Sequence, residues 1–81
     1  MDRTREVIEL IAKETGMSEE QVKPQSKLED DLSMNELERI DLVFVLEENF
    51  VIEIDDDEIE KWETVADIIA CVNNKTEQNN G

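Results

Sequence analysis

Apolar residues recur at intervals of three and four along three segments of the chain, which is the spacing of one face of an α-helix. They predict helices over 3–15, 36–49 and 65–73, and Asp55 or Asp56 can cap a shorter helix over 56–61. The second segment carries the broadest apolar row, and that row is wider than one core contact requires. We therefore expect part of it to face an internal pocket or a partner. The row consists of Leu37, Ile40, Val43, Phe44, Leu46 and Phe50.

The connections between these helices differ in character. Residues 16–34 contain Pro24 and form a long loop, in which Ser18 and Gln21 have the capping-box spacing of a single helical turn. Residues 51–55 alternate like a strand but have no partner strand, so we expect an extended connector. The predicted fold is all-α: a small bundle of three longer helices and one short helix over 1–73. A polar tail over 74–81 is predicted to be disordered.

Charge narrows the choice of partner. The 81 residues include 23 acidic and 8 basic side chains, a net charge of −15, and residues 28–60 hold 14 of the acids but only one base, Arg39. Such a field repels nucleic acids and anionic membranes and attracts basic protein surfaces. The simpler alternative is that the acids only keep the protein soluble. We expect a monomer that does not insert into membranes.

Composition also limits the protein class. The chain has no histidine, the commonest general base near neutral pH, and it is too short for a deep cleft, so an enzyme is not expected. Its single cysteine, Cys71, cannot form an intrachain disulfide and is expected to pack as a small core residue. We expect Trp62 to pack over the core as well. Because the single cysteine gives no sign of secretion, we expect a cytoplasmic location.

An ordered series of motifs between residues 28 and 72 resembles the acyl carrier protein family. Asp30–Leu37 reads DDLSMNEL, Leu46–Phe50 reads LEENF, Ile54–Glu58 reads IDDDE, and Thr64, Val65, Asp67 and Ile69 follow. The family's signature is E-D-L-G-x-D-S-L, followed by L-E-E-x-F. The resemblance implies a helical carrier of fatty acid or polyketide-type pathways, with a 4′-phosphopantetheine arm on the serine that begins the second helix.

The chain departs from the family pattern at that serine. Glu36 takes its place and Asn35 replaces the aspartate before it. Because a carboxylate cannot form the phosphodiester that a hydroxyl forms, we expect no arm and no other cofactor. One alternative is an arm on Ser33, which stands where the family has glycine. Another is an acidic or calcium-responsive adaptor that uses residues 55–58, although no specific metal site is expected.

The resemblance further implies that acids and apolar residues of the second and third helices dock onto basic patches of partner enzymes. For Phe44, the alternative to docking is a position in the core. Arg39 is expected to influence partner choice. Glu36 is either a favourable residue at a helix start or a charge that imitates the phosphate. The expected docking residues are Asn35, Glu36, Leu37, Glu38, Ile40, Asp41, Phe44, Glu47, Glu48, Asp56 and Glu60.

Overall fold

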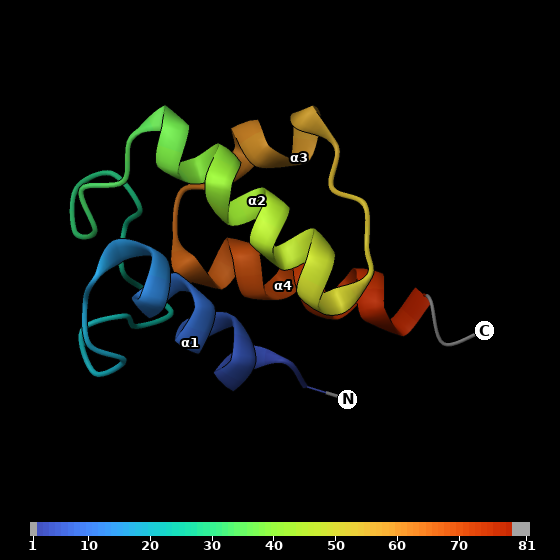
Figure 1. Cartoon of the computed structure of the whole chain (residues 1–81), viewed down its shortest axis with the longest axis horizontal. Helices are drawn as coiled ribbons and strands as arrows, with labels where there is room; N and C mark the ends of the chain where they lie inside the picture. The colour runs from blue at the N-terminus through green and yellow to red at the C-terminus, as the bar shows by residue number, and fades with distance from the viewer. Residues whose placement is uncertain (1, 79–81) are drawn as a thin grey trace.

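Four helices make up the regular structure of the computed structural model, which describes residues 2–78. They are α1 (Thr4–Thr15), α2 (Glu36–Phe50), α3 (Asp56–Lys61) and α4 (Val65–Gln78), in the order seen in Figure 1. No strand occurs in this part of the chain, although Lys27 and Thr64 form an isolated β-bridge. The predicted all-α bundle of three longer helices and one short helix is confirmed.

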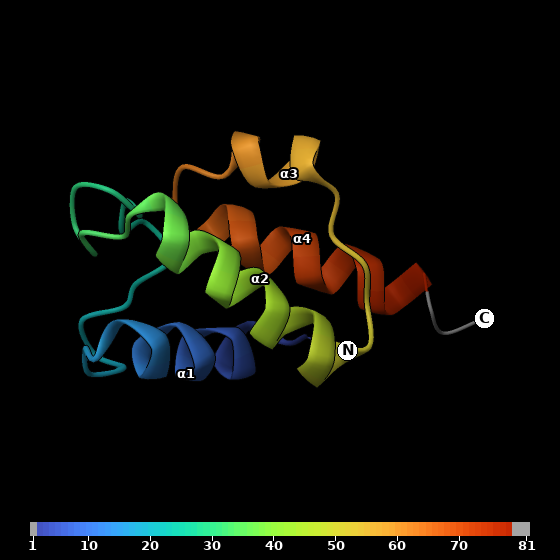
Figure 2. The same ribbon diagram turned by 45° about the horizontal axis from the view of Figure 1, so that its top comes forward.

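The three longer helices pack against one another and enclose the core. Helix α1 contacts both α2 and α4, and α2 also contacts α4. Helix α3 lies at the edge of this group, beside α2 and above α4, in both orientations of the ribbon (Figures 1 and 2). The core is drawn from all three long helices and from the first loop. Its most completely buried side chains are Val7, Ile11, Val22, Leu28, Leu42, Leu46, Val65, Ile68 and Val72.

The long first loop is held by its own buried side chains. Val22, Leu28, Leu32 and Met34 are buried, and Met17 is partly buried against the core. Ser18 and Gln21 form a turn, because the Ser18 N–H donates to Gln21 Oε1 at 3.0 Å. The Gln21 N–H donates to the Ser18 carbonyl at 3.0 Å and the Val22 N–H donates to the Glu19 carbonyl at 3.2 Å, so a single tight turn forms there without continuing as a helix.

Backbone hydrogen bonds then fasten the loop to the start of α4. The Leu28 N–H donates to the Glu63 carbonyl at 2.9 Å, and the Val65 N–H donates to the Ser26 carbonyl at 3.0 Å. These bonds satisfy backbone groups that no helix or strand could pair. They place the residues before α2 and the residues before α4 side by side.

Helix ends lie within one residue of their predicted positions except at the C-terminus of α4. Gly16 ends α1 in the left-handed conformation (φ 74°). Helix α3 has the predicted bounds, and α2 continues one residue beyond its predicted end. The boundary expected at 73 is wrong, because α4 continues through residues 74–78; residues 79–81 of the expected tail lie outside the described residues.

The longer α4 has contacts that a local pattern does not reveal. Asn73 Oδ1 accepts a hydrogen bond from the Arg3 N–H at 2.7 Å, and Lys75 pairs with Glu58 of α3 at 3.0 Å. Both contacts join α4 to distant parts of the chain and support its last turns. None of the helices in residues 2–78 combines the length and apolar composition needed to cross a bilayer.

Candidate functional site

The start of α2 is fixed by a reciprocal capping box. The Asn35 side chain accepts a hydrogen bond from the Glu38 N–H at 2.8 Å, and Glu38 Oε1 accepts one from the Asn35 N–H at 3.1 Å. This arrangement satisfies backbone donors that a helix start leaves unpaired. Glu36 is the first residue of the helix, and its side chain is exposed there. A carboxylate at this position interacts favourably with the positive end of the helix dipole.

Helix α2 buries only part of its apolar row. Leu42, Val43 and Leu46 face the core, whereas the side chains of Leu37, Ile40 and Phe44 are 73%, 42% and 59% exposed. Intervals of three and four place the exposed trio along one stripe of the helix. Phe44 is therefore not a core residue, and the extra width of the row faces outward rather than into an internal pocket.

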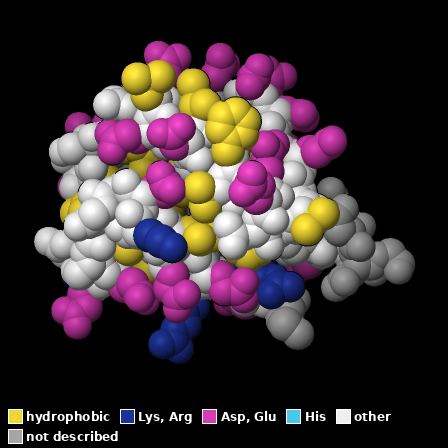
Figure 3. Space-filling model, viewed as in Figure 1, with side chains coloured by type: hydrophobic (Ala, Val, Ile, Leu, Met, Phe, Trp, Pro, Cys, Tyr) yellow, Lys and Arg dark blue, Asp and Glu magenta, His cyan; other side chains and the backbone are white. Residues whose placement is uncertain are grey.

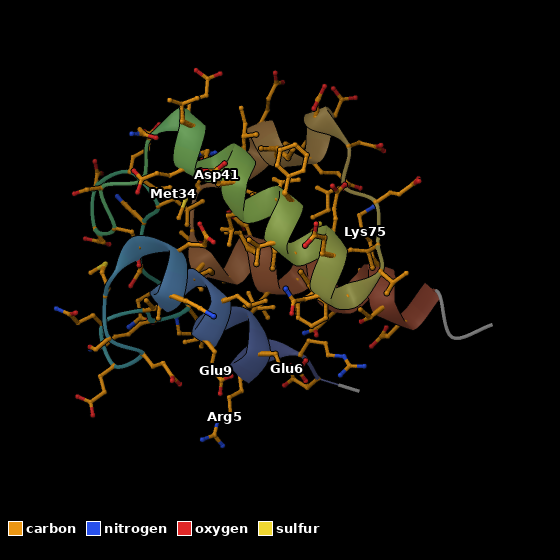
Figure 4. The ribbon with its side chains drawn as sticks, viewed as in Figure 1. Arg5, Glu6, Glu9, Met34, Asp41 and Lys75 are labelled. Carbon is orange, nitrogen blue, oxygen red and sulfur yellow. The ribbon has the colours of Figure 1, made fainter. Side chains whose placement is uncertain are left out.

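Acidic side chains surround this exposed stripe. Asp41 and Glu48 are exposed on α2 itself, and Asp56 and Glu60 are exposed on α3. Figure 3 shows the same face as an alternation of apolar and acidic side chains with very few basic ones. Figure 4 places Met34 in the loop directly before α2 and Asp41 on α2 itself. An apolar stripe within a negative field is a surface suited to a partner that is both apolar and basic.

A groove of about 500 Å³ between α2 and α3 is lined by several of the expected docking residues. Glu36, Ile40, Asp56 and Glu60 all line it, and the structure adds residues that the sequence reasoning did not assign to the site. Those additions are Glu29 and Ile59, and Arg39, which was expected to influence partner choice, lines the groove as well. Ile59 is the single apolar side chain of α3, which was a usable signal for a position facing α2.

Other expected docking residues have structural partners. The side chains of Asn35 and Glu38 are engaged in the capping box. Glu47 Oε2 accepts a hydrogen bond from the Ile54 N–H at 2.9 Å, so this carboxylate holds the connector between α2 and α3. Glu47 therefore differs from Asp41 and Glu48, whose carboxylates are exposed on the face of α2.

Arg39 does not behave as a surface charge. Its side chain is 16% exposed, and Nη1 donates to the carbonyl oxygens of Ile59 at 3.3 Å and Trp62 at 3.1 Å. Its Nη2 lies 3.9 Å from Glu29 Oε1. Its guanidinium is directed to the end of α3, and the expectation that Arg39 influences partner choice stays a prediction.

A second charged cluster joins α3 to α4. Glu58 Oε1 lies 3.0 Å from Lys75 Nζ, and the Cys71 thiol donates to Glu58 Oε2 at 3.7 Å. Desolvation acts to raise the pKa of Glu58, but the hydrogen bonds from Lys75 and the Asp55 N–H outweigh it and leave that pKa below its ordinary value. The hydrogen bond to Glu58 raises the pKa of Lys75. Both groups are therefore charged near neutral pH.

Cys71 and Trp62 are packing residues. Burial, together with the neighbouring Glu58 carboxylate, raises the pKa of the Cys71 thiol to about 11, so the thiol is protonated and a poor nucleophile at neutral pH. Trp62 is 3% exposed and belongs to the core. Between residues 2 and 78, no three His, Cys, Asp or Glu side chains converge on a position that could hold a metal ion.

Comparison with known families identifies the class of protein. A family model described as a phosphopantetheine attachment site matches residues 5–72. The chain is 38% identical over 72 residues to the acyl carrier protein of Helicobacter hepaticus, covering 89% of this chain and 95% of that protein. It is 37% identical over 75 residues to the acyl carrier protein of Nitratidesulfovibrio vulgaris, covering 93% and 99%.

Solved structures agree with the sequence relatives. The acyl carrier protein of Thermotoga maritima superposes with a TM-score of 0.78 at 30% identity, over 91% of this chain and 86% of that one. The acyl carrier protein of Enterococcus faecalis superposes with a TM-score of 0.76 at 28% identity, over 93% and 99%. The chain belongs to the acyl carrier protein family. The family consists of carriers rather than enzymes, which confirms the expected class, and its members interact with carrier-dependent enzymes.

Proposed function

We propose that this chain is a divergent acyl carrier protein that lacks the 4′-phosphopantetheine arm and acts by docking onto basic surfaces of carrier-dependent enzymes. The observation that carries the proposal is the side chain at the first residue of α2. Glu36 is exposed there, within a regular capping box, and it has no hydroxyl. We further infer that the protein acts as a cytoplasmic monomer.

The chemistry at the start of α2 does not fit an attached arm. Members of the family ordinarily carry the arm through a phosphodiester on a serine hydroxyl, and the resemblance aligns Glu36 with that serine. A carboxylate offers no alcohol to esterify, and its charge repels the incoming phosphate. Glu36 instead stabilises the helix start by roughly 0.3–1 kcal/mol through the helix dipole.

The docking face does not depend on an arm. Leu37, Ile40 and Phe44 expose apolar surface beside the carboxylates of α2 and α3, and the short α3 leaves this surface uncovered. Acids on the rim steer a basic partner and raise its association rate, while the apolar stripe supplies contact area. Binding should therefore weaken as salt screens the charges.

Ser33 supports a second candidate function, that of a carrier primed at a neighbouring residue. It is exposed and is the only hydroxyl-bearing residue between 28 and 50. However, its backbone is left-handed (φ 53°), and it precedes the Asn35 cap instead of following it. A modifying enzyme would have to accept a loop conformation in place of a helix start. The calcium-responsive alternative has no such observation in its favour.

Intact-mass measurement tests both candidates. The purified protein is incubated with coenzyme A and a broad-specificity phosphopantetheinyl transferase, beside Glu36→Ser and Ser33→Ala variants. We expect no mass gain for the wild-type protein and a gain of one arm for Glu36→Ser. A gain of one arm on the wild-type protein would overturn the proposal, and its loss in Ser33→Ala would locate the arm at Ser33.

The role of the Glu36 charge can be tested separately. Partners captured from the native host by the wild-type protein are compared for affinity with Glu36→Gln, which keeps the size of the side chain and removes its charge. Weaker binding by Glu36→Gln would support imitation of the phosphate. Equal binding would leave Glu36 as a residue that serves only the helix start.

A further inference from the structure

Helix α3 has little that holds it in place. It has six residues, none of them buried, and only Ile59 packs partly against the core. Helices this short are unstable in isolation, because few internal hydrogen bonds offset the cost of ordering the chain. The position of α3, and with it one wall of the acidic groove, therefore depends on contacts made by its neighbours.

Arg39 provides such a contact from α2. The last carbonyl groups of a helix lack intrahelical partners and form the negative end of its dipole. The Arg39 guanidinium donates to two carbonyls at this end of α3, those of Ile59 and Trp62. It reaches them across a gap of 20 and 23 residues in sequence. Arg39 thus acts as a C-terminal cap supplied by another helix.

The same side chain lies between two surface grooves. One of about 500 Å³ is lined by Glu36, Ile40 and Asp56, and another of about 410 Å³ by Lys27, Trp62 and Thr64. Glu29, Arg39 and Glu60 line both. The guanidinium therefore lies at the boundary of the two grooves, beside the end of α3.

We propose that Arg39 is a positioning residue that holds α3 against α2 and keeps the acidic groove in one preformed shape. The link from this shape to docking rests on the proposed function. Lys75 of α4 assists from the other side through its pair with Glu58 at 3.0 Å. Each flanking helix therefore contributes one cation to the placement of α3.

Hydrogen exchange measured at short labelling times tests the proposal without any partner. The informative amides are Ile59, whose N–H donates to the Asp55 carbonyl at 3.2 Å, and Trp62, whose N–H donates to the Ile59 carbonyl at 3.2 Å. In Arg39→Gln we expect both to exchange about tenfold faster, because bonds from a charged donor are lost. Amides in α1, α2 and α4 should keep their wild-type rates.

Arg5→Gln is the matched control. It removes one positive charge as Arg39→Gln does, but the Arg5 side chain is 89% exposed, and within residues 2–78 its ion pair is with Glu9 at 3.7 Å. We expect wild-type exchange throughout. Equal rates at Ile59 and Trp62 in both variants and the wild-type protein would overturn the proposal, as would acceleration spread evenly over all four helices.

Arg39→Lys keeps the charge and covers the case in which Arg39→Gln fails to fold. One ammonium group does not reproduce the planar fork that reaches both carbonyls, so we expect exchange between the wild-type and Arg39→Gln rates. Wild-type exchange rates at Ile59 and Trp62 in Arg39→Lys would contradict the argument that the planar guanidinium is needed to reach both carbonyls. A mass gain in the priming assay would overturn the proposed function and leave this result unaffected, so the two failures can be distinguished.

Discussion

The assignment of the docking face is tested most directly by the different costs of truncating two neighbours on α2. Phe44 is 59% exposed, whereas Leu46 is completely buried. Full burial of a large apolar side chain contributes about 1.5–3 kcal/mol, so the two-fifths of Phe44 that is covered contributes roughly 0.6–1.2 kcal/mol. Alanine also has a higher helix propensity than phenylalanine, and this offsets a few tenths of a kcal/mol of the loss.

Leu46→Ala removes a side chain from the core and leaves a cavity. Such substitutions cost about 2–5 kcal/mol. We therefore expect Phe44→Ala to lower the free energy of unfolding by no more than about 1 kcal/mol, and Leu46→Ala by at least twice as much. Leu37→Ala should cost less than Phe44→Ala, since Leu37 is 73% exposed.

Urea unfolding followed by tryptophan fluorescence measures these differences. Trp62 is the only tryptophan and is buried, so its emission reports on unfolding of the core. If the free energy of unfolding falls with urea concentration at a similar slope in each variant, the variants expose comparable surface on unfolding. If Phe44→Ala cost as much as Leu46→Ala, Phe44 would be a packing residue and the exposed stripe would lose its largest member.

Three further predictions concern the end of α2, the pair of Glu58 with Lys75, and the net charge. Val51 ends α2 in the left-handed region (φ 54°), and its side chain is 82% exposed. Val51→Gly should relieve about 1–2 kcal/mol of strain and lose about 0.4–1 kcal/mol to unfolded-chain entropy, a net gain of up to about 1.6 kcal/mol. Tm should therefore rise, by several degrees at the middle of this range, and a lower Tm would contradict this reasoning. The pKa of Glu58 lies below its ordinary 4.5, so its stabilising pair is fully present above that pH and is lost as the pH falls below it. Lys75→Met should therefore lower Tm at pH 7 by a margin that shrinks as the pH falls below 4.5, whereas a constant margin would exclude the ion pair as the cause. Added sodium chloride should raise Tm, because it screens repulsion within a net charge of −15; a Tm insensitive to salt would mean that the carboxylates are already compensated.

Helix positions were predictable because their signals are local. Asn35 and Glu38 form the capping box that starts α2, and Gly16 supplies the left-handed residue that ends α1. Such signals act over three or four residues, and the sequence displays them directly. The end of α4 was not predictable in this way, since its polar last turns are supported by contacts of Asn73 with Arg3 and of Lys75 with Glu58.

The candidate site was only partly predictable for a similar reason. The spacing of Leu37, Ile40 and Phe44 revealed a wide apolar row but not which edge of it would remain uncovered. That edge is exposed because α3 is short and lies to one side. Glu47 reads as one more surface acid in the sequence, yet its carboxylate binds the Ile54 N–H of the connector.

The sequence by itself determined the helical class, the family resemblance and the absence of a hydroxyl at the first residue of α2, because these depend on residue identity and short-range spacing. Only the tertiary structure decided that Arg39 turns away from solvent and binds the Ile59 and Trp62 carbonyls. A guanidinium on a polar-looking helix position has no local partner that would reveal this. Its environment is created when the start of α2 meets the end of α3, 20 to 23 residues further along the chain, in the folded bundle.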